Sequence, residues 1–286
     1  MSKKIPLLLL LAAAALMARD PLADRIAHTK PETYRDLKAV HEGAGEMQFT
    51  TLVPGDAFET NLLFVHRGVL KPHGGIGHHV HSHMEEMFFI LDGSAQFTIN
   101  GRTSQIDGPA SVPCRMSNAH AIYNQTDKPV EWMNIAVSTR KGKYDAFNLG
   151  DDRVGAPLDK IPVFISVRYE ADKLRPVEGA DGVFSRRALP ETIFYTNWAY
   201  VDHILVKPGA KTLPERHEGV EELYYVLRGN GTAHVNGESA AMAQDDALPV
   251  LFGDIHAFEN TGSGDLQLLV VGVAKKKWET DTSIIE

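Results

Sequence analysis

The chain has 286 residues, a formal net charge of −8 and one cysteine, with 43% hydrophobic and 23% charged residues. This composition is typical of a soluble globular protein with one large domain or two of ordinary size. Because no basic face is indicated, nucleic acid is not an expected partner. The lone cysteine, Cys114, excludes an intramolecular disulfide and an all-cysteine zinc site.

Residues 1–18 have the layout of a secretory signal peptide. Lys3 and Lys4 are followed by an apolar run from Ile5 to Met17 and then by small residues. The run is short for a membrane span, so we expect export to the periplasm or medium, with no membrane contact in the mature protein. The alternative is a cytoplasmic protein whose apolar N-terminal helix packs on the domain or on a partner subunit.

An internal repeat with a constant offset of 136 residues covers most of the chain. The matched pairs include Glu85-Glu86 with Glu221-Glu222, Asn100-Gly101 with Asn236-Gly237, Pro113 with Pro249, His120 with His256, and Asn124 with Asn260. The series indicates two copies of one unit, about 42–137 and 178–273. We therefore predict two domains, 31–150 and 151–286.

Each unit has the sequence pattern of β-structure. MFFILDG and LYYVLRG are short runs of aromatic and branched residues that end at a glycine. The Asn-Gly pairs lie between strand-like runs, where both residues of a type I′ hairpin turn need positive φ. No long segment has helical periodicity, so the expected fold is all-β, with two small barrels or sandwiches.

The stretch HHVHSHMEE concentrates candidate metal ligands in the first unit. On a strand, alternate side chains share a face, which groups His79, His81 and His83. Glu86 begins the next strand, and His120 comes from a later one. Three imidazoles and a carboxylate suit a divalent transition metal such as Fe, Mn, Zn, Ni or Cu. His83 is left as a fifth ligand, a hydrogen-bond donor to a ligand, or a proton shuttle.

These residues resemble the two sequence motifs of the cupin superfamily, and the repeat resembles its bicupins. The first motif, G-x5-H-x-H-x(3,4)-E-x6-G, is matched through Gly93, and the second ends H-x3-N, as at 120–124. His73 and Ser117 stand where the family has glycine. The resemblance implies two tandem double-stranded β-helix (jelly-roll) barrels packed as a pseudo-dimer. It also implies four metal ligands in the first unit, namely His79, His81, Glu86 and His120.

The second unit departs from the family pattern at one ligand position, where Glu215 replaces the first histidine. The corresponding residues are Glu215, His217, Glu222 and His256. A set with two carboxylates is harder and more anionic than the first, which favours Mn or Fe(II) over Cu. The alternative is a degenerate site in a barrel that serves as a scaffold.

Several functions are compatible with such a site, because a fold does not fix a function. The first hypothesis is a metal-dependent oxidoreductase of the dioxygenase type, acting on a small organic molecule in the first barrel. The alternatives are a non-redox lyase, decarboxylase or isomerase with Mn or Zn, and a non-catalytic metal- or sugar-binding bicupin. The catalytic candidates are His83, for proton transfer, and Arg115, for binding an anionic substrate. Arg115 has a salt bridge at the barrel rim as its alternative role, and assembly into a homo-oligomer is left open.

Overall fold

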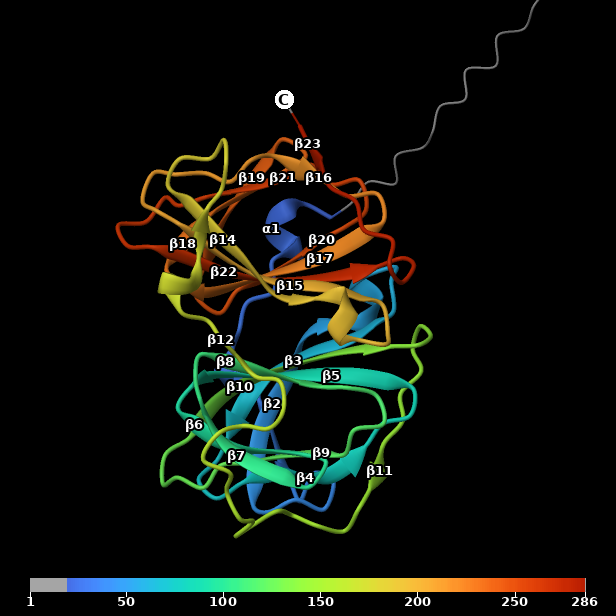
Figure 1. The fold of residues 1–286 in the computed structure, drawn as a ribbon. Helices are drawn as coiled ribbons and strands as arrows, with labels where there is room; N and C mark the ends of the chain where they lie inside the picture. Colours follow the sequence, from blue (N-terminus) through green and yellow to red (C-terminus); the bar gives the residue numbers. More distant parts are fainter. Residues whose placement is uncertain (1–19, 286) are drawn as a thin grey trace, which may run out of the picture.

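The structure is a computed structural model that describes residues 20–285, so the predicted signal peptide lies outside the described residues. It confirms the all-β prediction: two β-barrels are stacked on one another, the N-terminal one below and the C-terminal one above in Figure 1. No helix in the described range is long and apolar enough to cross a membrane. The helices are short: α1 (Leu22–Arg25), η1 (Pro31–Thr33), η2 (Gly55–Ala57), η3 (Ala171–Lys173) and η4 (Glu191–Ile193).

The first barrel is formed by two antiparallel sheets with a shared apolar core. Its larger sheet has the strand order β1 (Arg35–Lys38), β2 (Glu46–Pro54), β3 (Leu62–Leu70), β10 (Val130–Ser138), β5 (Met84–Asp92), β8 (Ala110–Cys114), β12 (Val167–Arg168). Its smaller sheet has the order β11 (Phe147–Asn148), β4 (Gly75–Val80), β9 (His120–Tyr123), β6 (Ser94–Ile99), β7 (Arg102–Asp107). Phe88 on β5 packs with Phe97 on β6 between the two sheets.

The second barrel repeats this arrangement. Its larger sheet has the order β13 (Arg175–Pro176), β14 (Val183–Pro190), β15 (Trp198–Val206), β22 (Leu266–Ala274), β17 (Val220–Arg228), β20 (Ala247–Val250). Its smaller sheet has the order β19 (Glu238–Ala243), β18 (Asn230–Val235), β21 (His256–Glu259), β16 (Glu215–Arg216), β23 (Ser283–Ile284).

The structure confirms the 136-residue repeat. β3, β5, β6, β7, β9 and β10 have the same bounds, shifted by that offset, as β15, β17, β18, β19, β21 and β22. The predicted hairpin turns also form, because Asn100 and Gly101 have φ of 50° and 80°, and Asn236 and Gly237 have φ of 52° and 85°.

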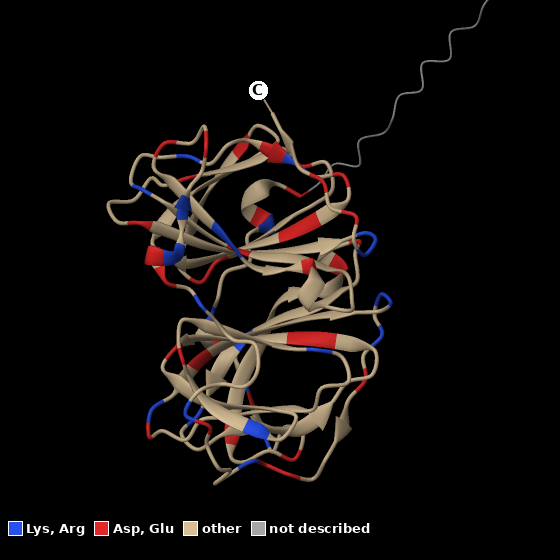
Figure 2. Cartoon of the chain, viewed as in Figure 1, with Lys and Arg blue, Asp and Glu red and all other residues tan. Residues whose placement is uncertain are grey.

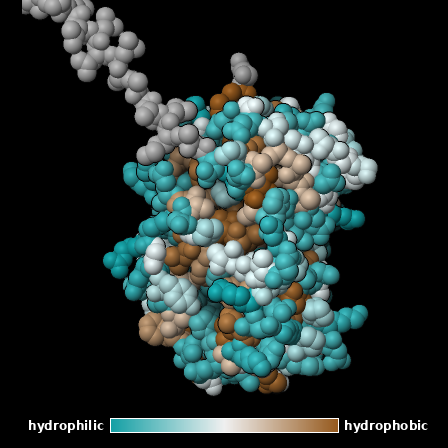
Figure 3. Space-filling view, turned by 180° about the vertical axis from the view of Figure 1, so that it is seen from behind, coloured by the Kyte–Doolittle hydropathy of each residue, from teal (hydrophilic) through white to brown (hydrophobic). Residues whose placement is uncertain are grey.

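The larger sheets pack against each other and give the barrels a common core. Met87 and Phe89 of β5 join Leu223 and Tyr225 of β17 in one buried cluster. In the space-filling view, hydrophobic residues gather near the middle of the molecule, at the level of this junction (Figure 3). The burial of apolar sheet faces against each other explains why the two units form the predicted pseudo-dimer.

A reciprocal pair of buried glutamates also joins the barrels. Glu85 of β5 accepts hydrogen bonds from the backbone N–H groups of Tyr195 and Thr196, at 3.0 and 2.7 Å. In turn, Glu221 of β17 accepts from the backbone N–H of Thr60, at 2.7 Å. The acidic residues of β5 and β17 appear as red segments in Figure 2. Each Glu-Glu dipeptide thus sends its first carboxylate to the other barrel, because successive side chains on a strand face opposite ways.

The N-terminal segment crosses to the second barrel. Leu22 and Ile26 are buried in the core of that barrel, and Arg25 pairs with Asp254 at 2.6 Å. Figure 1 shows α1 in blue among the C-terminal strands. Residues 22–29 therefore pack against the second barrel, although they precede the first barrel in the sequence.

The segment between the two repeats keeps its contacts with the first barrel. Arg153 donates to the hydroxyls of Thr98 and Thr103, and β12 pairs with β8. The predicted domain boundary at residues 150 and 151 stays a prediction. The segment still contacts the first barrel at Tyr169, whose hydroxyl lies 2.8 Å from that of Ser111.

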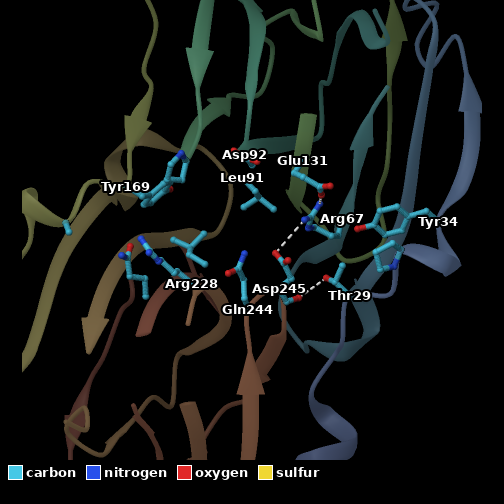
Figure 4. Close-up of a pocket in the computed structure, with 15 residues that line it drawn as sticks. Thr29, Tyr34, Arg67, Leu91, Asp92, Glu131, Tyr169, Arg228, Gln244 and Asp245 are labelled. Atoms are coloured by element: carbon cyan, nitrogen blue, oxygen red, sulfur yellow. Dashed lines mark hydrogen bonds and ion pairs between the residues drawn. The ribbon is translucent and has the colours of Figure 1, made fainter. Parts of the chain in front are cut away.

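A polar cavity of about 830 Å³ lies between the barrels, away from both candidate metal clusters. Figure 4 shows Arg67 pointing toward Asp245 of the other barrel, at 3.5 Å. The buried guanidinium of Arg67 also pairs with Glu131 at 2.5 Å and donates to the hydroxyl of Tyr225. The positive charge of Arg67 is therefore paired with carboxylates within the junction.

Candidate metal centres

The four residues predicted as ligands in the first unit converge inside the first barrel. His79 on β4 and His120 on β9 are opposite one another in paired strands, and Glu86 lies on β5. His81 lies just after the end of β4. All four side chains are buried, and their ligand atoms lie within 4.8 Å of one another.

Backbone carbonyls fix the orientation of the three imidazoles. Each uses Nδ1 for a hydrogen bond, His79 to Gly77, His120 to Asn118 and His81 to Asp145. The Nε2 atoms of His81 and His120 lie 3.3 and 3.2 Å from Oε2 of Glu86, and that of His79 lies 3.9 Å away. Contacts of this kind hold metal-binding imidazoles in one orientation and tautomer.

Electrostatics keep two members of the cluster, Glu86 and His79, in the forms suited to metal binding. Burial alone would raise the pKa of Glu86, but the imidazoles of His120 and His81 beside its carboxylate hold it well below its usual value. Burial lowers the pKa of His79 to about 2, so this imidazole is neutral at pH 7. A carboxylate and a neutral imidazole are the protonation states that bind metals.

The donor set fits a divalent transition metal. Nε2 of His81 is buried and has no hydrogen-bond partner among the described residues, although it lies 3.3 Å from Oε2 of Glu86. A metal ion would satisfy this atom, and an imidazole-rich set with one carboxylate suits the transition metals from Mn to Zn.

His83 is not grouped with these residues. β4 ends at Val80, so the alternation of a strand stops before His81, and His83 lies exposed in the turn that precedes β5. The prediction that His83 shares the ligand face is therefore wrong. The backbone N–H groups of this turn bind the Asp145 carboxylate, which holds the turn that carries His81.

Asp145 is a positioning residue that sequence reasoning missed. Its carboxylate binds the turn after β4, and its carbonyl accepts from His81. Asp281 does the same for His217 in the second barrel. The signal was present in the sequence, because 145 and 281 differ by the repeat offset, just beyond the span in which the repeat was recognised.

Arg115 lies at the junction of the barrels. Its guanidinium stacks over the ring of Tyr195, 4.4 Å from the centroid, and this ring belongs to the second barrel. The rim salt bridge considered as its alternative role is not among its described contacts. Its catalytic role stays a prediction that this position does not support.

A cavity of about 480 Å³ adjoins the first cluster. His79 and Glu86 line it together with aromatic and aliphatic side chains such as Phe49, Phe88 and Trp132. None of the described residues that line it is a lysine or an arginine.

The second cluster has the predicted composition and is also compact. Glu215, His217, Glu222 and His256 place their ligand atoms within 4.8 Å of one another, and all but Glu215 are buried. Nε2 of His256 lies 3.1 Å from Oε2 of Glu222 and 3.5 Å from Oε1 of Glu215. Nε2 of His217 is, like that of His81, buried without a hydrogen-bond partner.

Protons compensate the second carboxylate in the metal-free second cluster. Burial lowers the pKa of His256, but hydrogen bonds to Glu215 and Glu222 outweigh this effect and raise it to about 9. The imidazoles of His217 and His256 beside the carboxylate likewise overcome burial and lower the pKa of Glu222. At pH 7 His256 would have to give up a proton before it could serve as a metal ligand.

The fold and clusters define a class of protein: a double β-barrel with a buried His/Glu metal-binding cluster in each barrel. The cupin domain family matches residues 66–136 and 202–272, which coincide under the repeat offset. The chain therefore belongs to the cupin superfamily and is a bicupin, as the two sequence motifs indicated.

Related chains share parts of this sequence. An uncharacterised protein of Methanocaldococcus jannaschii is 29% identical over 120 residues, which cover 42% of this chain and 95% of that protein. An oxalate-binding protein of Thermotoga maritima is 39% identical over 64 residues, 22% of this chain. The match spans about half (53%) of the length of the oxalate-binding protein.

Solved structures share the whole architecture at low identity. The oxalate decarboxylase of Bacillus subtilis aligns with a TM-score of 0.62 and 16% identity, over 91% of this chain and 78% of that one. The salicylate 1,2-dioxygenase of Pseudaminobacter salicylatoxidans aligns with a TM-score of 0.61 and 16% identity, over 82% of this chain and 78% of that one. At this identity the likeness shows a common fold.

Proposed function

We propose that the protein is a metal-dependent oxidoreductase of the dioxygenase type, with its active site in the first barrel. His79, His81, Glu86 and His120 hold the metal in this proposal. When bound, the metal supplies open coordination positions and redox chemistry for a reaction with dioxygen. The observation that carries the proposal is the apolar cavity directly beside a cluster of three histidines and one glutamate.

The lining of this cavity supports an aromatic or otherwise apolar substrate. Burying an apolar ring against Phe49, Phe88 and Trp132 is favourable, whereas a small dianion requires cationic partners. The described lining has no lysine or arginine to provide them. The cavity therefore favours the substrate type of the salicylate dioxygenase over that of the oxalate-binding and oxalate-decarboxylating relatives.

Two buried polar atoms support a specific orientation of the substrate. Within residues 20–285, Trp132 Nε1 and Asn134 Oδ1 have no hydrogen-bond partner, and both residues line the cavity. The Asn134 side chain also donates to Oε1 of Glu86, at 3.0 Å. A substrate with one polar group beside an apolar ring satisfies these two atoms, and it is thereby held next to the metal ligands.

Oxygen consumption tests this function. The protein is loaded with Fe(II), Mn(II), Ni(II) or Cu(II), and oxygen uptake is measured with phenols, aromatic hydroxy acids, oxalate and sugars. We expect uptake with an aromatic compound and not with oxalate. H81A should lose this activity together with the metal of the first barrel, while the matched variant H217A should keep both.

The alternatives predict other results. Carbon dioxide release from oxalate or another acid without oxygen uptake would replace the proposal with a non-redox lyase. Ligand binding without turnover by every loaded form would support a non-catalytic binding protein.

A further inference from the structure

A tyrosine hydroxyl lies among the ligand atoms of the second cluster. Oη of Tyr224 lies 3.2 Å from Oε1 of Glu215, 3.3 Å from Oε2 of Glu222 and 3.0 Å from Nε2 of His256. Tyr224 is on β17 and fully buried. At the same repeat position the first barrel has Phe88, which has no hydroxyl.

These distances match those between atoms that share a metal ion. Ligands about 2.0–2.2 Å from one ion are about 3.0–3.5 Å apart in octahedral or tetrahedral arrangements. Three pairs of ligand atoms in the second cluster show this spacing: 3.1 Å between His256 and Glu222, 3.3 Å between His217 and Glu222, and 3.5 Å between His256 and Glu215. The hydroxyl oxygen of Tyr224 is therefore spaced as a further ligand atom.

We propose that Tyr224 is the fifth ligand of the second metal site, and that this site binds a hard trivalent cation, Fe(III). On binding, the O–H bond of Tyr224 and the N–H bond at Nε2 of His256 break, both protons pass to water, and the phenolate oxygen takes the place of a citrate oxygen on the ion. Two carboxylates and one phenolate supply three negative charges, which balance the charge of Fe(III). Hard oxygen donors suit such an ion.

The surroundings hold this oxygen in position. The ring of Tyr224 stacks on Phe258, with 4.1 Å between centroids. Tyr200 donates to Oε1 of Glu222 at 2.8 Å, and so orients that carboxylate with its other oxygen toward Tyr224. Packing and hydrogen bonding of this kind fix a metal ligand before the ion arrives. The proposal goes beyond the function of the first barrel and does not depend on it.

A charge-transfer spectrum tests this assignment without any measurement of activity. The first site is emptied with H81A, and the full chain is loaded with ferric citrate. We expect one Fe(III) per chain and a visible absorption band from phenolate-to-iron charge transfer, with phenolate vibrations enhanced in resonance Raman spectra. Y224F should lose the band. Y195F, at a tyrosine whose side chain is exposed and lies outside this cluster, should keep it.

Three results would overturn the proposal. The first is Fe(III) bound in the second barrel of H81A without a phenolate band. The second is a band that persists in Y224F. The third is a chain that has the native fold by circular dichroism but binds no Fe(III). In that case the Tyr224 hydroxyl would occupy the position of an ion and hold the ligand side chains together by hydrogen bonds. Because the Raman measurement uses the intact Tyr224, the proposal stays testable even if Y224F does not fold.

Discussion

At the residue scale, a few repeat positions make the two clusters chemically different. Each places an oxygen-bearing side chain in the second barrel where the first has a ring without oxygen. These positions are 64 and 200 (Phe and Tyr), 79 and 215 (His and Glu), and 88 and 224 (Phe and Tyr). At position 83, where the second unit has Gly219, the histidine side chain is exposed in a turn. The first cluster therefore faces an apolar cavity, and the second is surrounded by hydroxyl and carboxylate oxygens.

His66 is a further, half-buried histidine of the first cavity. Its ring stacks on Phe64, with 3.8 Å between centroids, and burial lowers its pKa to about 4. In the unfolded chain the pKa is close to 6.5. Above pH 6.5 His66 is neutral in both the folded and the unfolded chain, so it causes no loss of stability in that range. As the pH falls from 6.5 toward 4, only the unfolded chain takes up the proton, and the folded state loses stability.

We therefore predict that H66F reduces the acid sensitivity of the protein. Between pH 7 and pH 5, His66 should account for a loss of about 2 kcal/mol in the free energy of unfolding. Urea unfolding of the metal-free protein at both pH values measures this loss. H73Q, at an exposed histidine, is the control. An equal loss in H66F and wild type would contradict the assigned protonation of His66.

At the element scale, the strands and turns could be predicted from the sequence. The aromatic and branched runs that end at Gly93 and Gly229 form β5 and β17, and the Asn-Gly pairs form the hairpins. These signals are local: side-chain periodicity and the positive φ of two residues. The ligand clusters were also predicted, because their spacing is part of the family motifs.

Contacts between elements could not be predicted in the same way. Strand alternation groups His81 and His83 only if the strand continues, and nothing local places its end at Val80. The role of Glu85 depends on which face of β5 meets the other barrel. Tyr224 looks like one more aromatic core residue until β21 brings His256 beside it. Each of these facts depends on tertiary packing.

The glutamates at the junction give a prediction for these elements. Glu85 accepts three hydrogen bonds from Tyr195 and Thr196, counting the Thr196 hydroxyl. In E85Q an amide replaces the buried charged acceptor, so we expect the free energy of unfolding to fall by about 2–3 kcal/mol. Denaturant unfolding at pH 7 measures it, with the exposed Glu32 changed to Gln as the control.

The same experiment reports on the coupling of the barrels. E221Q should also destabilise the protein, because Glu221 accepts from Glu59 and Thr60. If E85Q and E221Q both stay within about 0.5 kcal/mol of wild type, as surface changes do, these contacts do not hold the barrels together.

At the scale of the whole molecule, the two barrels depend on each other. They share one apolar core, and residues 22–29 tie the start of the chain to the second barrel. Export stays a prediction. Cleavage after Ala18 would leave α1 in the mature chain, and N-terminal sequencing of periplasmic protein would identify the cleavage site.

The duplicated architecture also allows the two sites to differ in metal and role. We propose that the first barrel carries the chemistry, because its cluster adjoins an apolar cavity. The second site is more anionic and is contacted by two tyrosine hydroxyls. One chain therefore offers a softer, histidine-rich site and a harder, oxygen-rich one.

The central claim is that His79, His81, Glu86 and His120 hold a transition metal. Anomalous diffraction from crystals of the metal-loaded protein, recorded at the absorption edge of that metal, tests it most directly. We expect a peak in the first barrel about 2.0–2.2 Å from Nε2 of each of the three histidines and from a carboxylate oxygen of Glu86. A fully loaded crystal with no peak at these four atoms would contradict the account.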